Sequence, residues 1–550
     1  MSTLTVRSPN ATQAITFTHG QTLLEALDAS ELSCRAGCRG NGACGLCLVR
    51  IESGDGGEPT VNERLHLDEA GLAEGKRLAC QVRPQADLTI TLLAPERRSA
   101  WRRLPDQDLA QDLGQNLGQS LGQTNNILPT LLTAGARNGP VDLGVAVDLG
   151  TTHIRVSVVD LDTGQRLTGR QGLNPQAYFG ADVMTRLVAA AESGEHLRRM
   201  QSVVLDALAA ALQDIALRDG VDIGRVRRVY IVGNTAMLAL LATRNCDLLL
   251  LPRSWSAPVD CTPGETNGWA RALGIDPEAR IELIQPLAGF VGSDLLAGVL
   301  DTGLMDGNRG SLFIDFGTNS EIALWDGQTL WATSVAGGPA FEGSGSSCGF
   351  PGEPGAIRRI RRTAQGFDFE VIGGQEPLGI CGSGFVDLIA ELVRTGLLTA
   401  KGRFTPVIQN GRFVLVPGEP NIGLTEADVD LFQRAKAALG AGIQALIAES
   451  GMDRNGLHRV CIGGVFGRHL DTANAQAVGL LPGGPPDAIE LFEGAALAGC
   501  TKMLLSSSTY RRVARIREQA TMVNLSGYAG FEEAYVDHLF LRPMSVHSGA

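Results

Sequence analysis

The stretch Cys34-Arg-Ala-Gly-Cys38-Arg-Gly-Asn-Gly-Ala-Cys44-Gly-Leu-Cys47 decides the fold of the first part of this 550-residue chain. It holds four of the 11 cysteines, and Cys80 follows about thirty residues later. The other six cysteines are scattered singly from residue 246 onward. Because thiols stay reduced in the cytosol, clustered cysteines in a cytosolic protein indicate metal or redox chemistry before disulfides.

The spacing Cys38-x5-Cys44-x2-Cys47, completed by Cys80, is close to that of plant-type ferredoxins, with one residue more in the first gap. Glycines let the loop backbone approach a cluster closely, and the loop has four of them, Gly37, Gly40, Gly42 and Gly45. Zinc is the main alternative, although zinc sites more often use two matched C-x2-C pairs. We therefore expect Cys38, Cys44, Cys47 and Cys80 to hold a [2Fe–2S] cluster. Cys34 is surplus and is the alternative to Cys38.

The residues around this loop predict a small β-grasp domain. Alternating apolar residues predict two strands before the loop and two after it, and an apolar helical face predicts one helix. The expected elements are strands at 3–7, 13–18, 48–52 and 88–92 and a helix at 22–29. We expect a ferredoxin-like domain over residues 1–95.

Residues 96–140 have the character of a linker. Four successive four-residue units begin at Gln107, Gln111, Gln115 and Gln119, each with leucine in the third position. Glycines within them weaken a helix by about 1 kcal/mol each. We expect a flexible or partly helical tether, which as a coil of ~30 residues reaches about 30 Å. A helix that makes a homodimer is the alternative.

Two similar hairpins mark the rest of the chain, residues 141–545. One contains Val145-Ala-Val-Asp148-Leu-Gly150-Thr151-Thr152 and the other Leu312-Phe-Ile-Asp315-Phe-Gly317-Thr318-Asn319. Each turn offers backbone N–H groups and hydroxyls to phosphate oxygens and an aspartate to a water bound to Mg²⁺. Two copies in equivalent strand contexts predict a duplicated architecture in which Asp148 and Asp315 are the catalytic residues.

Three further glycine-rich turns lie between apolar segments, at Gly233-Asn234, Gly382-Ser383-Gly384 and Gly463-Gly464. Each leads towards a helix, and helix N-termini bind anions readily. In this order, the turns match the plan of actin-like ATPases, with Gly463 and Gly464 near the adenosine. The sequence therefore predicts an ATP site with Mg²⁺.

The chain resembles the reductive activators of corrinoid proteins, which join a [2Fe–2S] ferredoxin domain to an actin-like (ASKHA) ATPase domain. The resemblance is carried by the cysteine loop and by Gly233-Asn-Thr-Ala-Met237, Asp315-Phe-Gly-Thr-Asn-Ser-Glu321, Gly338-Pro-Ala-Phe-Glu-Gly343, Pro354-Gly-Ala-Ile357, Gly379-Ile-Cys-Gly-Ser-Gly384, Gly463-Gly464 and Val478-Gly-Leu-Leu-Pro482. It implies an α+β and α/β multidomain enzyme. Such an enzyme transfers one electron, with ATP, to the Co(II) corrinoid of a methyltransferase system and restores Co(I).

Composition and charge limit the partners. The net charge of −12 argues against nucleic acid or an anionic membrane as the main partner. The first twenty residues lack the features of a signal peptide, and no run of about 18 uninterrupted apolar residues occurs, so we expect a cytoplasmic protein. We expect two partners, a corrinoid protein and an unidentified low-potential electron donor. The alternative functions are a redox-gated small-molecule kinase and a cluster-based redox sensor.

Overall fold

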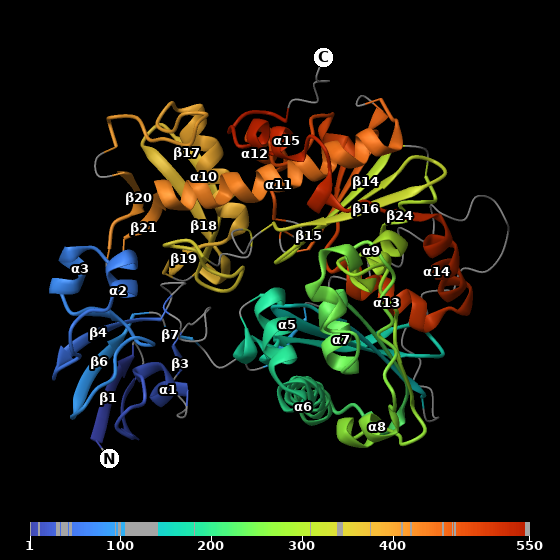
Figure 1. The fold of residues 1–550 in the computed structure, drawn as a ribbon, viewed down its shortest axis with the longest axis horizontal. Coiled ribbons are helices and arrows are strands. Elements are labelled where there is room, and N and C mark those ends of the chain that lie inside the picture. Colours follow the sequence, from blue (N-terminus) through green and yellow to red (C-terminus); the bar gives the residue numbers. More distant parts are fainter. Residues whose placement is uncertain are drawn as a thin grey trace. The chain divides into compact units, whose positions relative to one another are not determined.

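The computed structural model describes residues 2–8, 11–28, 33–34, 42, 47–93, 95–96, 101–104, 141–180, 182–307, 310–337, 341, 345–374, 376–408, 411–418, 421–453, 456–464, 466 and 469–544. The chain divides into two compact units (Figure 1). The first contains Met1–Arg102 and Pro175–Ala189, and the second contains Arg103–Asn174 and Ala190–Ala550. Cys38, Cys44 and the leucine repeat lie outside the described residues.

A five-stranded sheet forms the first unit, in the order β2-β1-β6-β4-β5. Its strands are β1 (Ser2–Ser8), β2 (Ala11–Phe17), β4 (Leu48–Ser53), β5 (Lys76–Leu78) and β6 (Leu88–Leu92). β1 pairs antiparallel with β2 and parallel with β6, which is the mixed pairing of a β-grasp sheet. The inward residues of these strands pack with Leu23, Leu24 and Leu27 of helix α1 (Leu23–Asp28) in one core. The predicted strands and helix are confirmed to within a few residues.

Shorter elements complete this unit. Helices α2 (Val61–His66) and α3 (Glu69–Ala73) lie between β4 and β5, and β3 (Ser33–Cys34) pairs with β7 (Pro95–Glu96). The unit also contains the 3-10 helix Pro175–Phe179 and most of α5 (Val183–Glu192).

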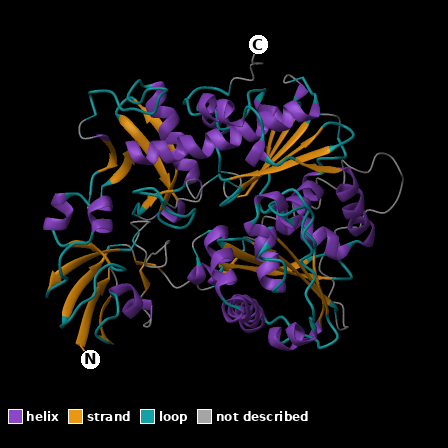
Figure 2. Cartoon of the chain, viewed as in Figure 1, coloured by secondary structure: helices purple, strands orange, loops and turns teal. Residues whose placement is uncertain are grey.

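Two six-stranded sheets build the second unit, and five strands of each have the same topology; the sixth comes before the others in sequence in the first sheet (β8) and after them in the second (β24) (Figure 2). In each sheet, a three-stranded antiparallel meander is extended on the side of its first strand by two parallel strands. The first sheet runs β13-β12-β9-β10-β11-β8 and the second β23-β22-β14-β15-β16-β24. The duplicated architecture predicted from the two hairpins is therefore confirmed.

The strands of the first sheet are β8 (Arg102–Arg103), β9 (Leu143–Leu149), β10 (His153–Asp160), β11 (Arg166–Leu173), β12 (Val226–Gly233) and β13 (Arg280–Leu283). Those of the second are β14 (Ser311–Phe316), β15 (Ser320–Trp325), β16 (Leu330–Val335), β22 (Arg459–Gly464), β23 (Ile489–Leu491) and β24 (Ala520–Met522). β8 falls within the stretch assigned from sequence to the linker. No apolar pattern marks it, because both of its side chains are exposed.

Helices cover the sheets and fill the space between them. They are α6 (Gly194–Asp219), α7 (Thr235–Ala242), α8 (Asn267–Leu273), α9 (Ser293–Thr302), α10 (Gly382–Arg394), α11 (Glu426–Ser450), α12 (Thr472–Ala477), α13 (Ala495–Leu505), α14 (Ser507–Gln519) and α15 (Phe531–His538). α13 contacts β9, β12 and α9, while α11 contacts β15, β16 and α15. Near α10, two smaller sheets are formed by β17 (Ala356–Thr363), β18 (Gly366–Val371) and β19 (Gly379–Ile380) and by β20 (Arg412–Val416) and β21 (Ile422–Thr425).

The long helix α6 is amphipathic. Ser193 caps its first turn, and Gly220 ends it in the left-handed conformation. By length and apolar composition, α6 is the one described helix that meets the requirement for crossing a membrane. That is weak evidence, because the core helices of many proteins meet the same requirement. Here its buried stripe, from Met200 to Ile215, faces its own unit, and the helix contacts α7, α8 and β11.

Candidate functional site

Cys47 and Cys80 come from segments that the first sheet brings together. Cys47 precedes β4, Cys80 follows β5, and the two strands pair with Leu48 opposite Leu78. The amide of Ala79 donates to the carbonyl of Cys47 at 2.8 Å. The pairing of the two strands therefore extends to Cys47 itself and to the residue before Cys80. Both cysteine side chains are buried. Two of the four predicted ligands thus lie at one end of the same strand pair.

A buried ion pair anchors the segment that carries Cys80. Glu63 accepts from the Arg77 guanidinium at 2.8 and 3.0 Å and from the Leu78 amide at 3.0 Å. Thr60 and Glu63 also form the reciprocal capping box of α2. Burial alone raises the pKa of Glu63, but the hydrogen bonds from Arg77, Thr60 and Leu78 outweigh it and leave that pKa lowered. Glu63 is therefore an ionised anchor for Arg77 and Leu78, which lie three and two residues before Cys80.

Gly42 shows why the loop needs glycine. Its φ is +75°, and a Cβ at this position meets the side chains of Asn62 and Gln81 within 3 Å. The Gln81 amide, in turn, lies 3.5 Å from the Cys80 sulfur. This part of the loop is packed directly against the Cys80 segment, as four-thiolate ligation of one cluster requires. Cys38 and Cys44 lie outside the described residues, and of Cys34 only the backbone is described.

In the second unit, the two predicted phosphate loops face each other. The hydroxyls of Thr152 and Thr318 are 3.1 Å apart, although 166 residues separate them in sequence. Each loop is closed by a glycine: the Gly150 amide donates to the His153 carbonyl, and the Gly317 amide donates to the Asn319 carbonyl. The hairpins of the two sheets therefore meet at their turns, the arrangement that places one nucleotide's phosphates between two halves.

Two of the other glycine turns adjoin these loops. Gly233 is the β12 partner of Leu149, and Gly463 is the β22 partner of Asp315. A Cβ on Gly463 lies 3.3 Å from the Asp315 carboxylate, so the missing side chain keeps space beside it. Gly464 has φ +84°. Asn234 caps α7 by accepting from the Ala236 amide at 3.0 Å.

The turn at the start of α10 has packing contacts of its own. A Cβ on Gly382 meets the carbonyl of Phe341 at 2.1 Å, and one on Gly384 meets that of Ile357 at 2.4 Å. The Ser383 hydroxyl donates to the Arg358 carbonyl at 2.8 Å. Gly382 also lies next to Phe466, and Phe341 and Phe466 both pack on Phe316 of the second phosphate hairpin. Nucleotide contact by Gly382, Ser383 and Gly384 stays a prediction.

Four carboxylates gather behind the phosphate loops: Asp148, Asp294, Asp315 and Glu321. Asp148 and Glu321 are buried, and the other two are partly exposed. Desolvation, reinforced by Asp315 and Asp148, raises the pKa of Asp294 to about 8. Desolvation and Asp148 raise that of Asp315 to about 7, and desolvation with Asp294 and Asp315 raises that of Glu321. Because these carboxylates repel one another, a bound cation or a bound proton stabilises the group.

Arg155 is a positively charged residue that partly offsets the repulsion among these four carboxylates. Its guanidinium lies 3.6 Å from Asp148, and it lowers the pKa of both Asp148 and Asp315 against the larger effect of desolvation. Among the described residues, no three Asp, Glu, His or Cys side chains form a ready metal site.

Sequence reasoning missed Asp294 and Arg155 and gave Glu321 no role. Asp294 lies in a Gly-Ser-Asp turn at the start of α9, and Gly292 packs against the Gly233-Asn234 turn. That turn lies near the first phosphate loop because β12, which ends at Gly233, pairs with β9 in the first sheet. Arg155 carried a local signal, since it lies on the same hairpin as Asp148 and pairs with it across the strands.

The fold and the site define a class: a ferredoxin-like domain joined to a duplicated ASKHA-type nucleotide module. Family models agree along the chain. The "2Fe-2S iron-sulfur cluster binding domain" matches residues 8–85, the "RACo middle region" matches 143–307, and the "C-terminal domain of RACo the ASKHA domain" matches 309–548.

Individual proteins match over most of the chain. The corrinoid activation enzyme RamQ of Eubacterium limosum is 31% identical over 414 residues, which cover 72% of this chain and 69% of RamQ. The [Co(II) methylated amine-specific corrinoid protein] reductase of Methanosarcina barkeri is 28% identical, covering 70% of this chain and 73% of the reductase. A solved structure titled "Reductive activator for corrinoid,iron-sulfur protein" matches with a TM-score of 0.65 at 26% identity, covering 100% of this chain and 99% of that one.

The chain belongs to the family of reductive activators of corrinoid proteins, RACo. It is an enzyme with a [2Fe–2S] domain and an ATP-binding ASKHA domain. The predicted fold class and both of these cofactors are thereby confirmed.

Proposed function

We propose that this protein is an ATP-dependent reductive activator for the corrinoid protein of a methyltransferase system. In the reaction, Co(II) gains one electron and becomes Co(I), while the activator is oxidised by one electron. An unidentified low-potential donor then reduces the activator again. A cytoplasmic location and the absence of nucleic acid and membrane partners belong to the same proposal, as does a homodimer as one alternative oligomeric state.

The energetic problem is the reducing power of Co(I). The [2Fe–2S] cluster supplies an electron near −400 mV if it resembles plant-type clusters. Each further 100 mV that the cobalt demands costs about 2.3 kcal/mol for one electron. ATP offsets this cost if it binds more tightly to the conformation in which the corrinoid protein accepts the electron. A module of two halves that meet at Thr152 and Thr318 suits such a closure.

We assign the following roles to the site residues. Cys38, Cys44, Cys47 and Cys80 hold the cluster, and Glu63 with Arg77 keeps the Cys80 segment in place. Thr151, Thr152, Thr318 and Asn319, with Gly150 and Gly317, receive the phosphates. Asp148 and Asp315 orient waters on Mg²⁺, and Asp294 is a neighbouring carboxyl whose pKa is raised by desolvation, Asp315 and Asp148. Gly233, Asn234, Gly463 and Gly464 border the nucleotide.

The observation that carries this proposal is the presence, in one chain, of a [2Fe–2S] domain and a nucleotide module whose two phosphate loops touch. It is tested anaerobically with reduced activator, Mg·ATP and a Co(II) corrinoid protein. We expect the Co(II) absorption to be replaced by that of Co(I), and apo-activator without iron to give no change. Equal reduction of Co(II) by the apo-protein would show that the cluster does not supply the electron.

A further inference from the structure

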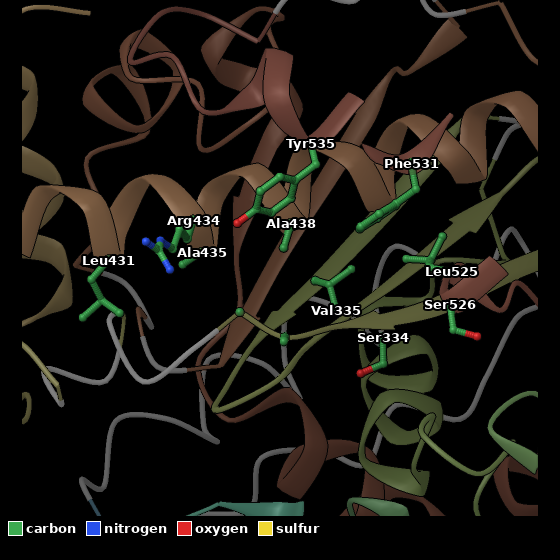
Figure 3. A pocket seen from close by; sticks show the side chains of 12 residues that line it. Ser334, Val335, Leu431, Arg434, Ala435, Ala438, Leu525, Ser526, Phe531 and Tyr535 are labelled. Carbon is green, nitrogen blue, oxygen red and sulfur yellow. The ribbon is translucent and has the colours of Figure 1, made fainter. Parts of the chain in front are cut away.

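A cavity of about 380 Å³ lies in the second unit, on the face of the second sheet that α11 covers (Figure 3). Its walls come from four segments: the end of β16 with the two residues that follow it, one face of α11, the 3-10 helix Leu525–Gly527 and α15. Small side chains make the space. Ala336 and Gly337 line it just after β16, and Ala435 and Ala438 line it from α11. The volume is that of a small-molecule site.

Most of the lining is apolar, although the serines Ser334 and Ser526 also line the cavity, on the side away from Arg434. Val335, Leu431, Leu525 and Phe531 supply hydrocarbon and ring surface. Arg434 and Tyr535 mark the polar end, and Figure 3 shows the Tyr535 hydroxyl directed towards the side where Arg434 lies. Asp430 holds only Nη2 of Arg434, at 2.8 Å, and a guanidinium has five N–H donors in a planar fork. Burial raises the pKa of Tyr535, so its hydroxyl is a neutral donor.

The cavity shares a wall with the nucleotide site. Ser334 and Val335 are the β16 partners of Glu321 and Ser320. The Ser334 hydroxyl, which lines the cavity, donates to the Glu321 carboxylate at 3.4 Å. A Cβ on Gly337 meets the Ser320 hydroxyl at 2.4 Å. A movement of the end of β16 therefore displaces Ser320 and Glu321, which directly follow the second phosphate loop.

We propose that this cavity binds an amphipathic carboxylate, with its chain among the apolar side chains and its carboxylate between Arg434 and Tyr535. The N–H donors of Arg434 that Asp430 does not take select the anion, and the apolar side chains select the chain. Occupancy fixes the end of β16 and, through Ser334, the position of Glu321. The effect on ATP turnover rests on the proposed function, whereas the binding itself does not.

The first test is calorimetric titration of the holoprotein, without nucleotide, with straight-chain fatty carboxylates from hexanoate to decanoate. We expect saturable binding at one site, with affinity rising up to ~4-fold for each added methylene. The corresponding neutral alcohols should bind at least ~10-fold more weakly, because they lose the charge-assisted hydrogen bonds. Equal binding of acids and alcohols, or no saturable binding, overturns the proposal.

Variants locate the site. Ala435→Leu fills the cavity and should abolish decanoate binding, whereas Ala448→Leu, at an exposed position of the same helix, should leave it unchanged. Arg434→Gln should weaken decanoate by ~10-fold while leaving decanol unaffected. Because Arg434 is largely exposed, this variant tests the site even if Ala435→Leu does not fold. Undiminished decanoate binding by Arg434→Gln excludes this cavity as the binding site.

The coupling is read from ATP hydrolysis with saturating decanoate. We expect the rate to change at least twofold in the wild type and in Ala448→Leu and to stay constant in Ala435→Leu. Binding without any change in rate overturns the coupling. Decanoate binding to a protein that fails to reduce a Co(II) corrinoid protein with Mg·ATP instead counts against the proposed function and leaves the site standing.

Discussion

Replacing Asp315 by asparagine tests whether the acid group behind the phosphate loops is built for a cation. Asparagine keeps the size of the side chain and removes its charge. The pKa of Asp315 is raised from 3.8 to about 7, mainly by desolvation and by Asp148. At 1.36 kcal/mol per pKa unit, the ionised carboxylate costs the nucleotide-free fold at most about 4 kcal/mol. Since the Asp315 side chain is partly exposed, solvent screens its charge, and we expect about half of that free-energy cost.

The sign of the effect follows from linkage. A carboxyl whose pKa is raised by folding costs nothing below pH 3.8, and its cost grows until the pH passes about 7. Asp315→Asn should therefore stabilise the apo-protein by about 2 kcal/mol at pH 8.5, and by roughly a third less at pH 6. The same variant should lose ATP hydrolysis by ~100-fold or more while keeping the cluster colour.

The assay is urea unfolding followed by tryptophan fluorescence. Four of the five tryptophans lie in the second unit, Trp255, Trp269, Trp325 and Trp331, so most of the signal reports on the nucleotide module; Trp101 belongs to the first unit. Mg·ATP should stabilise the wild type and leave the variant unchanged. The reasoning is refuted if Asp315→Asn is less stable than the wild type at pH 8.5 without nucleotide, or if it hydrolyses ATP at the wild-type rate.

Three further predictions concern single side chains. Cys44→Ser should abolish the visible absorption of the [2Fe–2S] cluster and Cys34→Ser should preserve it; the opposite pattern reassigns the ligands. Glu63→Gln leaves Arg77 buried without its counter-charge, so the free energy of unfolding of the domain should fall by about 3–5 kcal/mol. The cluster absorption should then be lost at a lower temperature, whereas the control Glu58→Gln, at an exposed position, should leave that temperature unchanged. Arg155→Met removes the cation that lowers the pKa of Asp148 and Asp315, so the acidic limb of the rate–pH profile for ATP hydrolysis should move to higher pH; an unmoved limb argues against the assignment.

The sequence predicted what depends on local pattern. Strand alternation located β1, β2, β4 and β6, and the repeated Asp-x-Gly-Thr turn predicted two equivalent sheets. Each signal depends only on residues that are neighbours in sequence. The helices α2 and α3 were missed, although Thr60 and Glu63 have the spacing of a capping box. Their apolar faces are too short to give a helical period.

Contacts between distant segments were beyond that reasoning. Asp294 and Glu321 became part of the site only when β9, β14 and the start of α9 converged. The cavity beside β16 depends on Ala435 and Ala438 of α11 facing α15, which no local pattern specifies. The placement of Cys38 and Cys44 lies outside the described residues, so their role is a proposal from spacing and family.

The central claim is that nucleotide binding drives an unfavourable electron transfer. Its direct test is the fraction of corrinoid present as Co(I) at equilibrium, measured by absorption under anaerobic conditions at fixed donor potential, with Mg·ATP and without it. The account predicts at least tenfold more Co(I), relative to Co(II), when Mg·ATP is present, and no such gain with Asp315→Asn. An equal fraction of Co(I) without nucleotide would contradict it.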